Sequence, residues 1–123
     1  MIDTDAKQPT SVYAIDLDGD GHIDVISVGD SSQTTWSGRK QIRWHVNDGN
    51  ATSFTTNYRA TYNNAPNWIG KSVFGTDLDG NGENDFLVAD CGSGLGGGDD
   101  RLTWWNANSG SFNYATAIST ALD

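Results

Sequence analysis

Two short stretches of this chain, Asp16–Asp24 and Asp77–Asp85, carry oxygen-bearing side chains at alternate positions. Ca²⁺ in proteins takes roughly six to eight oxygen ligands in flexible geometry, and a tight loop turns alternate carboxylates toward one centre. Each stretch also contains glycines, which adopt the positive φ that such a turn requires. The pattern therefore predicts one Ca²⁺ in each stretch, two per chain.

The predicted ligands of the first loop are the carboxylates of Asp16, Asp18, Asp20 and Asp24 and the backbone carbonyl of His22. Those of the second loop are the side chains of Asp77, Asp79, Asn81 and Asp85 and the carbonyl of Glu83. We expect weaker binding in the second loop, because Asn81 is a neutral amide where the first loop has a carboxylate. The alternative is an Asp-rich turn in which the carboxylates only accept backbone N–H groups.

An EF-hand does not fit these loops. Its bidentate closing acid would fall on Ser27 in one stretch and on Val88 in the other. The flanking residues also alternate as in strands, whereas an EF-hand needs helices on both sides.

The two loops belong to an internal repeat with an offset of 61 residues. Identical residues align without a gap from residue 11 to residue 49, and this alignment places Trp44 on Trp105. Repeats of this length are typical of arrays and propellers. We predict two units, residues 1–61 and 62–123, joined through a linker at Tyr62–Gly70.

Apolar and polar residues alternate with a period of two within each unit, which indicates β-strands. The expected strands are Val12–Leu17, Ile23–Val28, Ile42–Asn47, Phe54–Ala60, Val73–Thr76, Asp85–Ala89, Leu102–Ala107 and Phe112–Ala117. The sequence therefore predicts an all-β fold of two four-stranded antiparallel sheets.

Each repeat resembles an FG-GAP/VCBS repeat, the blade of integrin-α-type and lectin-type β-propellers. The matching segments of the first copy are Val12–Val25, the strand around Trp44 and Asn47–Gly49 leading to Phe54; those of the second are Val73–Asp85, Trp105, Asn108–Gly110 and Phe112. The resemblance implies propeller blades with Ca²⁺ between the first two strands of each. Asn81 departs from the acidic pattern.

Two blades are fewer than a closed propeller usually has. We therefore expect a homo-oligomer that closes the ring, preferably a trimer with six blades, with a dimer or tetramer as alternatives. The rival explanation is that the chain is a piece of a longer secreted protein.

Composition limits the possible partners. The formal net charge is −9 and no block of Lys or Arg is present, so we expect neither nucleic acid nor an anionic membrane surface as a partner.

No apolar run is long enough to span a membrane, and the polar N-terminus does not read as a signal peptide. The single cysteine, Cys91, excludes an intrachain disulfide. An extracellular or periplasmic location, where calcium is plentiful, is favoured.

The sequence favours binding over catalysis. His22 and His45 are its only histidines, and no catalytic triad, phosphate loop or zinc spacing appears. Gly94–Gly98 lacks the Lys of a phosphate loop and reads as a flexible hairpin. We therefore predict no enzyme but a calcium-stabilised binding module, with a carbohydrate-binding lectin as the first candidate.

The candidate ligand-binding residues are Trp36, Trp68 and Trp104, because sugar rings stack on exposed indoles. The alternatives are a structural or protein-interaction propeller, and an accessory fragment of a larger secreted enzyme.

Overall fold

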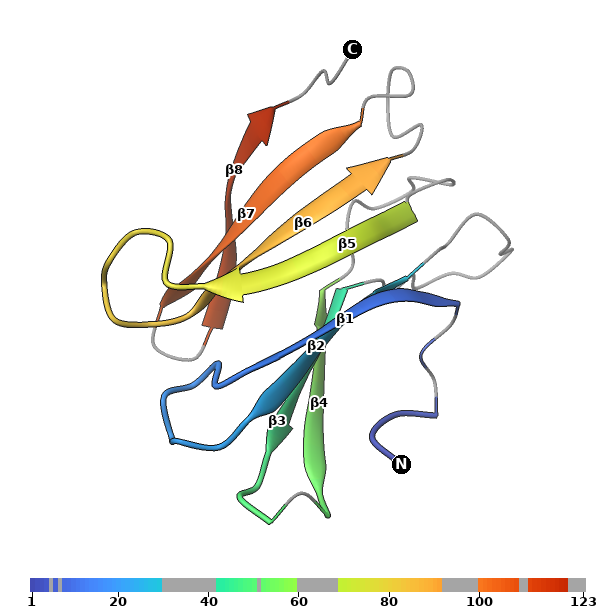
Figure 1. Ribbon diagram of the computed structural model, residues 1–123, viewed down its shortest axis with the longest axis vertical. Coiled ribbons are helices and arrows are strands. Elements are labelled where there is room, and N and C mark those ends of the chain that lie inside the picture. Colours follow the sequence, from blue (N-terminus) through green and yellow to red (C-terminus); the bar gives the residue numbers. More distant parts are fainter. Residues whose placement is uncertain are drawn as a thin grey trace.

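The computed structural model describes residues 1–4, 6, 8–29, 42–50, 52–59, 69–91, 100–108 and 111–119, and gives only the backbone of residues 58–59, 108, 111, 113–117 and 119. Every regular element in these ranges is a β-strand (Figure 1). The strands are β1 Pro9–Ile15, β2 Asp24–Gly29, β3 Ile42–Asn47, β4 Phe54–Arg59, β5 Ile69–Thr76, β6 Asp85–Cys91, β7 Arg101–Asn108 and β8 Ser111–Ser119.

The strands form two four-stranded antiparallel sheets in chain order, β1–β4 (the first sheet) and β5–β8 (the second sheet). The predicted all-β fold class is confirmed. Within the described residues there is no helix with the length and apolar character needed to cross a membrane.

Most of the expected strand ends differ from the structure, by one to four residues, and only Ile42–Asn47 matches at both ends. The expected strand Val12–Leu17 ends at Ile15, and the expected strand Ile23–Val28 begins at Asp24. Leu17 therefore lies in the loop between them, where its N–H donates to the Asp24 carboxylate at 2.8 Å. β5 begins at Ile69, so the expected linker Tyr62–Gly70 was drawn two residues too long, and residues 62–68 lie outside the described ranges. The boundary between units 1–61 and 62–123 also lies there and stays a prediction.

The hydrophobic core lies between the two sheets. Each sheet turns one face, here called its inner face, toward the other, and β-branched and aromatic residues fill both. The buried apolar residues are Leu17, Ile26, Val28, Ile42, Trp44, Val73, Phe86, Val88, Trp105, Ala107 and Phe112. Trp44 of the first sheet meets the edge of Phe112 at a centroid distance of 5.2 Å and lies 6.5 Å from Phe86 of the second. Such ring pairs each add about 0.5–1.5 kcal/mol beyond the area they bury.

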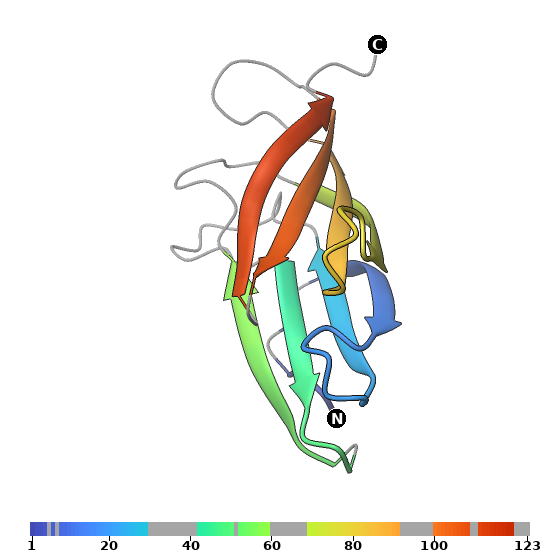
Figure 2. The ribbon, with the colours of Figure 1, turned by 90° about the vertical axis from the view of Figure 1, so that its left-hand side faces the viewer.

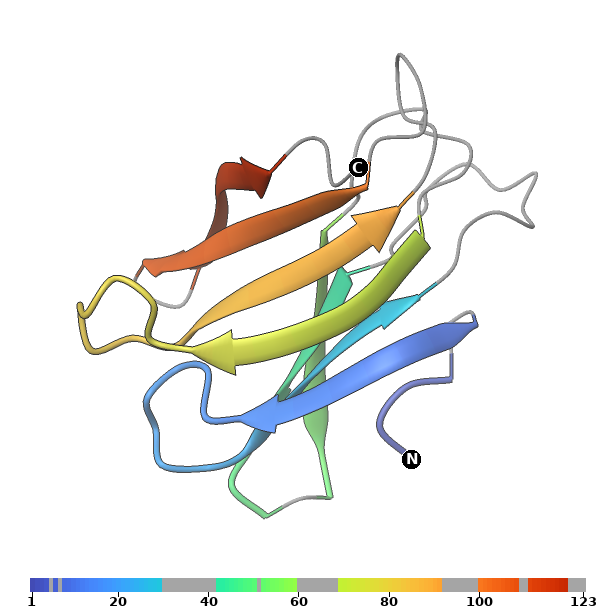
Figure 3. The same cartoon turned by 45° about the horizontal axis from the view of Figure 1, so that its top comes forward.

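The first strands of the two sheets run side by side, which Figures 1 and 3 both show. A Cβ at Gly75 of β5 would lie 2.8 Å from the Cγ2 of Ile15, so only glycine fits this close approach. The Ser11 hydroxyl of β1 accepts the Val73 N–H of β5 at 3.3 Å. Seen from the side in Figure 2, the outer strands β4 and β8 lie at the edge away from β1 and β5.

The outer face of the first sheet has a buried polar centre, although Val12 on the same face is 65% exposed. Ser27, Arg43 and His45 are 9%, 7% and 2% exposed. Arg43 Nη1 is paired with Asp3 Oδ2 of the N-terminal segment at 2.6 Å. The two His45 ring nitrogens lie 3.4 Å from the Ser27 hydroxyl and 3.0 Å from the Thr56 hydroxyl. His45 is therefore packed within the sheet, with a hydroxyl beside each ring nitrogen.

The structure changes the alignment of the two repeats in their third strands. Trp44 pairs with Ile26 across β2 and β3, and the matching partner of Leu87 across β6 and β7 is Trp104. The sequence alignment that matched Trp44 with Trp105 is therefore wrong by one residue in this strand, whereas Phe54 and Phe112 have equivalent positions in the fourth strands. Because side chains alternate between faces, Trp105 lies on the inner face of the second sheet and Trp104 on the outer face.

Candidate metal centres in two acidic loops

The loop between β1 and β2 is folded around the carboxylate of Asp16. Its two oxygens accept the N–H groups of Gly19 at 2.7 Å and Gly21 at 2.9 Å. Both glycines have positive φ, 78° and 89°, which places their N–H groups on the inside of the turn. A side chain there would be strained even though the space around it is open.

The loop between β5 and β6 repeats this geometry. The Asp77 oxygens accept the N–H groups of Gly80 at 2.7 Å and Gly82 at 2.9 Å, and these glycines have φ of 76° and 90°. Two sequences that differ at several positions therefore give the same local fold, because the Asp and the two glycines determine it.

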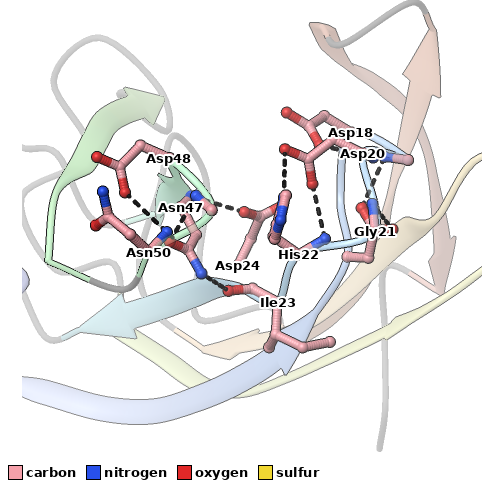
Figure 4. Close-up of polar contacts among 12 residues, drawn as sticks. Asp18, Asp20, Gly21, His22, Ile23, Asp24, Asn47, Asp48 and Asn50 are labelled. Atoms are coloured by element: carbon pink, nitrogen blue, oxygen red, sulfur yellow. Dashed lines mark hydrogen bonds and ion pairs between the residues drawn. The ribbon is translucent and has the colours of Figure 1, made fainter.

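A buried aspartate closes each loop and fixes it to the third strand of its sheet. Asp24 is fully buried, and its two oxygens accept the N–H groups of Leu17 and Asn47, each at 2.8 Å. Figure 4 shows Asp24 between the acidic loop and the Asn47 segment. Asn47 adds a bond from its amide nitrogen to the Ile23 carbonyl at 3.1 Å.

Asp85 has the equivalent position in the second sheet and accepts one more hydrogen bond than Asp24 does. It is fully buried, accepts the N–H groups of Leu78 at 3.1 Å and Ala107 at 2.8 Å, and also accepts the indole N–H of Trp104 at 3.0 Å. Neither these backbone contacts nor the indole bond was predicted, since the sequence pattern indicated only ligand roles for Asp24 and Asp85.

Three carboxylates converge in each loop. One oxygen from each of Asp16, Asp18 and Asp24 lies within 4.8 Å of the other two, and the same holds for the other group, Asp77, Asp79 and Asp85. These are hard oxygen donors with no sulfur or imidazole among them, the ligand chemistry that Ca²⁺ and Mg²⁺ prefer. The residues therefore fit a divalent cation of this class. In the first loop each oxygen of Asp16 and Asp24 accepts one N–H and keeps a further lone pair for the ion. In the second loop Asp77 Oδ1 and Asp85 Oδ2 each accept two hydrogen bonds.

The fifth position of each loop lies outside these groups. Asp20 accepts the His22 N–H at 2.8 Å and pairs with the His22 ring nitrogen at 3.1 Å (Figure 4). Asn81 accepts the Glu83 N–H at 2.7 Å. The contact between the two side chains lowers the pKa of the Asp20 carboxyl and raises the pKa of the His22 imidazole.

The electrostatics of the first loop favour a cation. Burial raises the pKa of Asp18, and the neighbouring charges of Asp20, Asp24 and Asp16 raise it further, against a lowering by the Asp20 N–H. A bound divalent ion would remove that repulsion, whereas a bound proton at Asp18 relieves only part of it.

Two polar contacts around the loops were not predicted. The amide of Asn106 on β7 donates to Asp79 at 2.6 Å, and the amide of Asn84 donates to the Asp16 carbonyl at 2.6 Å, so that the two loops are joined directly. The sequence showed that Asn47–Gly49 is repeated at Asn108–Gly110, but it did not show why the third residue is glycine. A Cβ at Gly49 would lie 2.9 Å from the His22 ring, and Gly49 has a φ of 92°.

Of the three tryptophans predicted to bind ligand, Trp104 lies within the described residues. Trp104 is partly exposed on the outer face of the second sheet, with its indole N–H directed at Asp85. Trp36 and Trp68 lie outside the described residues, as does the Gly94–Gly98 hairpin.

Fold and loops together define an all-β repeat protein in which each four-stranded sheet carries an acidic loop between its first two strands. The family model described as "FG-GAP-like repeat" matches residues 16–88, from the first acidic loop into β6. The chain therefore belongs to the FG-GAP-like repeat family, as its resemblance indicated. No curated protein and no solved structure matched it.

Proposed function

We propose that this chain is a calcium-stabilised β-propeller-type binding module in which each acidic loop holds one Ca²⁺. The observation that supports the proposal is the duplicated carboxylate group, Asp16, Asp18 and Asp24 in one loop and its three counterparts in the other. A bound ion would neutralise charges that the fold holds close together, and so stabilise the loops.

The same contacts argue for a structural role of the ion. Asp16 already accepts two backbone N–H groups, and Asp24 is tied to Leu17 and Asn47, so each loop is held in shape by the chain itself. An ion added to such a loop stabilises the folded state by mass action, since the unfolded chain does not bring these carboxylates together.

The choice of Ca²⁺ over Mg²⁺ rests on ligand number and geometry. Asp and Asn side chains at alternate positions, with a backbone carbonyl of His22 or Glu83, would give Ca²⁺ the irregular shell of oxygens that it accepts. Mg²⁺ demands near-octahedral geometry and retains several waters. We expect the second loop to bind more weakly because of Asn81.

Calorimetric titration with Ca²⁺ and with Mg²⁺ tests the proposal. We expect two calcium sites per chain, and only one in Asp18→Asn or in Asp79→Asn. Asp48→Asn is the matched control, because Asp48 is an exposed acid of the β3–β4 loop outside both groups. A parent chain that takes up no Ca²⁺, or an Asp18→Asn variant that binds as Asp48→Asn does, would disprove the proposal.

Recognition is the second part of the proposed function. Trp104 is the one predicted sugar-stacking residue that lies in the described ranges, and part of its ring is exposed. We propose a non-enzymatic, lectin-like module in an extracellular or periplasmic setting. The alternatives remain a structural or protein-interaction propeller and an accessory fragment of a secreted enzyme. A glycan array with and without EDTA separates a lectin from a structural or protein-interaction propeller, because only the lectin gives sugar-specific signals.

A further inference from the structure

The two acidic loops lie against each other at one end of the two sheets. Figures 1 and 3 show the β1–β2 loop and the β5–β6 loop at the same end, and both loops line one small hollow. A direct link between them is the amide of Asn84, which is partly buried and donates to the backbone carbonyl of Asp16 at 2.6 Å. A side chain of the second repeat therefore holds the backbone of the first loop.

The peptide unit that accepts this bond is also held from its other end. Its N–H is that of Leu17, which donates to Asp24 Oδ2 at 2.8 Å. Because a peptide unit is planar, a bond to its C=O and a bond to its N–H together fix its orientation. That orientation limits the backbone rotation at Asp16, and so where the Asp16 carboxylate lies relative to that of Asp24 in the metal-binding group.

Tight packing of the strands that lead into the loops keeps the two loops in this relation. A Cβ at Gly75, near the end of β5, would lie 2.8 Å from Cγ2 of Ile15, the last residue of β1. The rings of Tyr13 and Phe74 pack on each other across the same two strands, with centroids 4.8 Å apart. The contact between Asn84 and Asp16 therefore stands on a closely packed base.

Comparison of the two repeats shows that the second loop does not need this amide for its own fold. In the first repeat the residue before the closing aspartate is Ile23, which is 56% exposed and has no side-chain donor. The two loops nevertheless have the same geometry, with a first aspartate that accepts two glycine N–H groups and a buried aspartate that closes the loop. The amide of Asn84 therefore serves the neighbouring loop.

We propose that Asn84 is a positioning residue for the cation site of the first loop, so that this site is built from both repeats. The role assigned to Asn84 rests on the proposed function, in which the ion of that loop is Ca²⁺. Removing a side chain that orients metal ligands typically weakens metal binding about 10–100-fold. We expect a loss at the lower end, about tenfold, because Asn84 holds the backbone of a ligand residue and not its carboxylate.

Calorimetric titration with Ca²⁺ in the Asp79→Asn chain, where the first loop is the one expected to bind, tests the proposal. Adding Asn84→Asp keeps the shape of the side chain, removes its N–H donors and places a carboxylate beside the Asp16 carbonyl. We expect about tenfold weaker binding. Charge alone would have the opposite effect, since an added carboxylate attracts Ca²⁺. Asn84→Ala removes the donor without adding charge, should also weaken binding, and decides the question if the Asp variant fails to fold.

The matched control is Asn50→Asp in the same Asp79→Asn chain. Asn50 is exposed in the β3–β4 loop, and its side-chain oxygen, which aspartate retains, accepts the Thr52 N–H at 2.8 Å. This variant adds the same charge and should bind Ca²⁺ at least as tightly as the Asp79→Asn chain does. Melting temperatures in EDTA provide the second readout, because a purely structural role of Asn84 would lower them and leave the calcium affinity of the folded chain unchanged.

The possible outcomes separate this proposal from the proposed function. Equal calcium affinity with and without the Asn84 amide, or tighter binding in Asn84→Asp, would overturn the role of Asn84 alone. An equal loss in the second loop, measured for Asn84→Ala in the Asp18→Asn chain, would also overturn it, because the effect would then not be specific to the first site. An Asp79→Asn chain that takes up no Ca²⁺ would overturn the proposed function and the role of Asn84 together.

Discussion

The buried carboxylate of Asp24 is predicted to hold the first loop in place even without an ion. Asp24→Asn keeps the size of the side chain but turns one acceptor oxygen into an NH₂ group that faces a backbone N–H, either that of Leu17 or that of Asn47. The variant loses a hydrogen bond to a charged group and leaves a buried donor unsatisfied. Together these effects should cost about 3–5 kcal/mol, a large part of the stability of a domain.

The assay is thermal unfolding in EDTA, so that calcium ligation does not contribute. At about 4 °C for each kcal/mol in a chain of this size, Asp24→Asn should lower the melting temperature by roughly 12–20 °C. Asp85→Asn should cost at least as much, because Asp85 also accepts the Trp104 indole N–H.

Asp18→Asn is the control for this prediction. Asp18 is exposed and accepts a single N–H, that of Asp20, at 3.2 Å. In EDTA its replacement should change stability by no more than about 0.5 kcal/mol, whereas in calcium both variants should lose the stabilisation that the ion gives. If Asp24→Asn and Asp18→Asn had the same melting temperature in EDTA, the hydrogen bond between Asp24 and β3 would not stabilise the fold, and the reasoning would be refuted.

Three further predictions concern the rest of the chain. Gly75→Ala should destabilise the fold by about 1–3 kcal/mol in urea titrations, since its Cβ would lie 2.8 Å from Ile15 Cγ2; an unchanged midpoint would contradict this close approach. Burial lowers the pKa of the His45 imidazole below its ordinary value of 6.5, so the unfolded chain takes up a proton first. Stability should therefore be fully retained above about pH 6.5 and fall as the pH drops below it, with a flatter profile in His45→Gln. Asn81→Asp should tighten calcium binding in the second loop alone, and a calorimetric titration that shows no change would refute the role assigned to this amide.

The parts of the structure that depend on local sequence could be predicted. The acidic loops were located because the Asp carboxylates and the positive-φ glycines act within a few residues of one another. The period-two alternation likewise gave the strands, with errors of a few residues at their ends. The FG-GAP-like family was recognised from the same residues.

The parts that depend on contacts across the sheets were missed. Asp24 reads as a ligand in sequence, and its second role requires the Asn47 N–H from another strand. The pairing of Trp104 with Leu87 could not be found by matching identical residues, because Trp44 and Trp105 align in sequence but not in the ladder. The contact of Asn84 with Asp16 joins residues of different repeats and leaves no pattern in either.

The adjacent tryptophans of β7 have a consequence for how this repeat tolerates change. Trp104 and Trp105 place one indole on each face of the second sheet, so a slip of one residue in this strand would exchange one indole for the other. In β3 the same slip would bring Arg43 or His45 into the position of Trp44, among apolar neighbours. After such a slip the second sheet would still have an indole in one of the two positions, with Thr103 or Asn106 in the other, whereas the first sheet would have no indole in the position of Trp44. The adjacent tryptophans therefore make the strand alignment of β7 less dependent on a single side chain than that of β3.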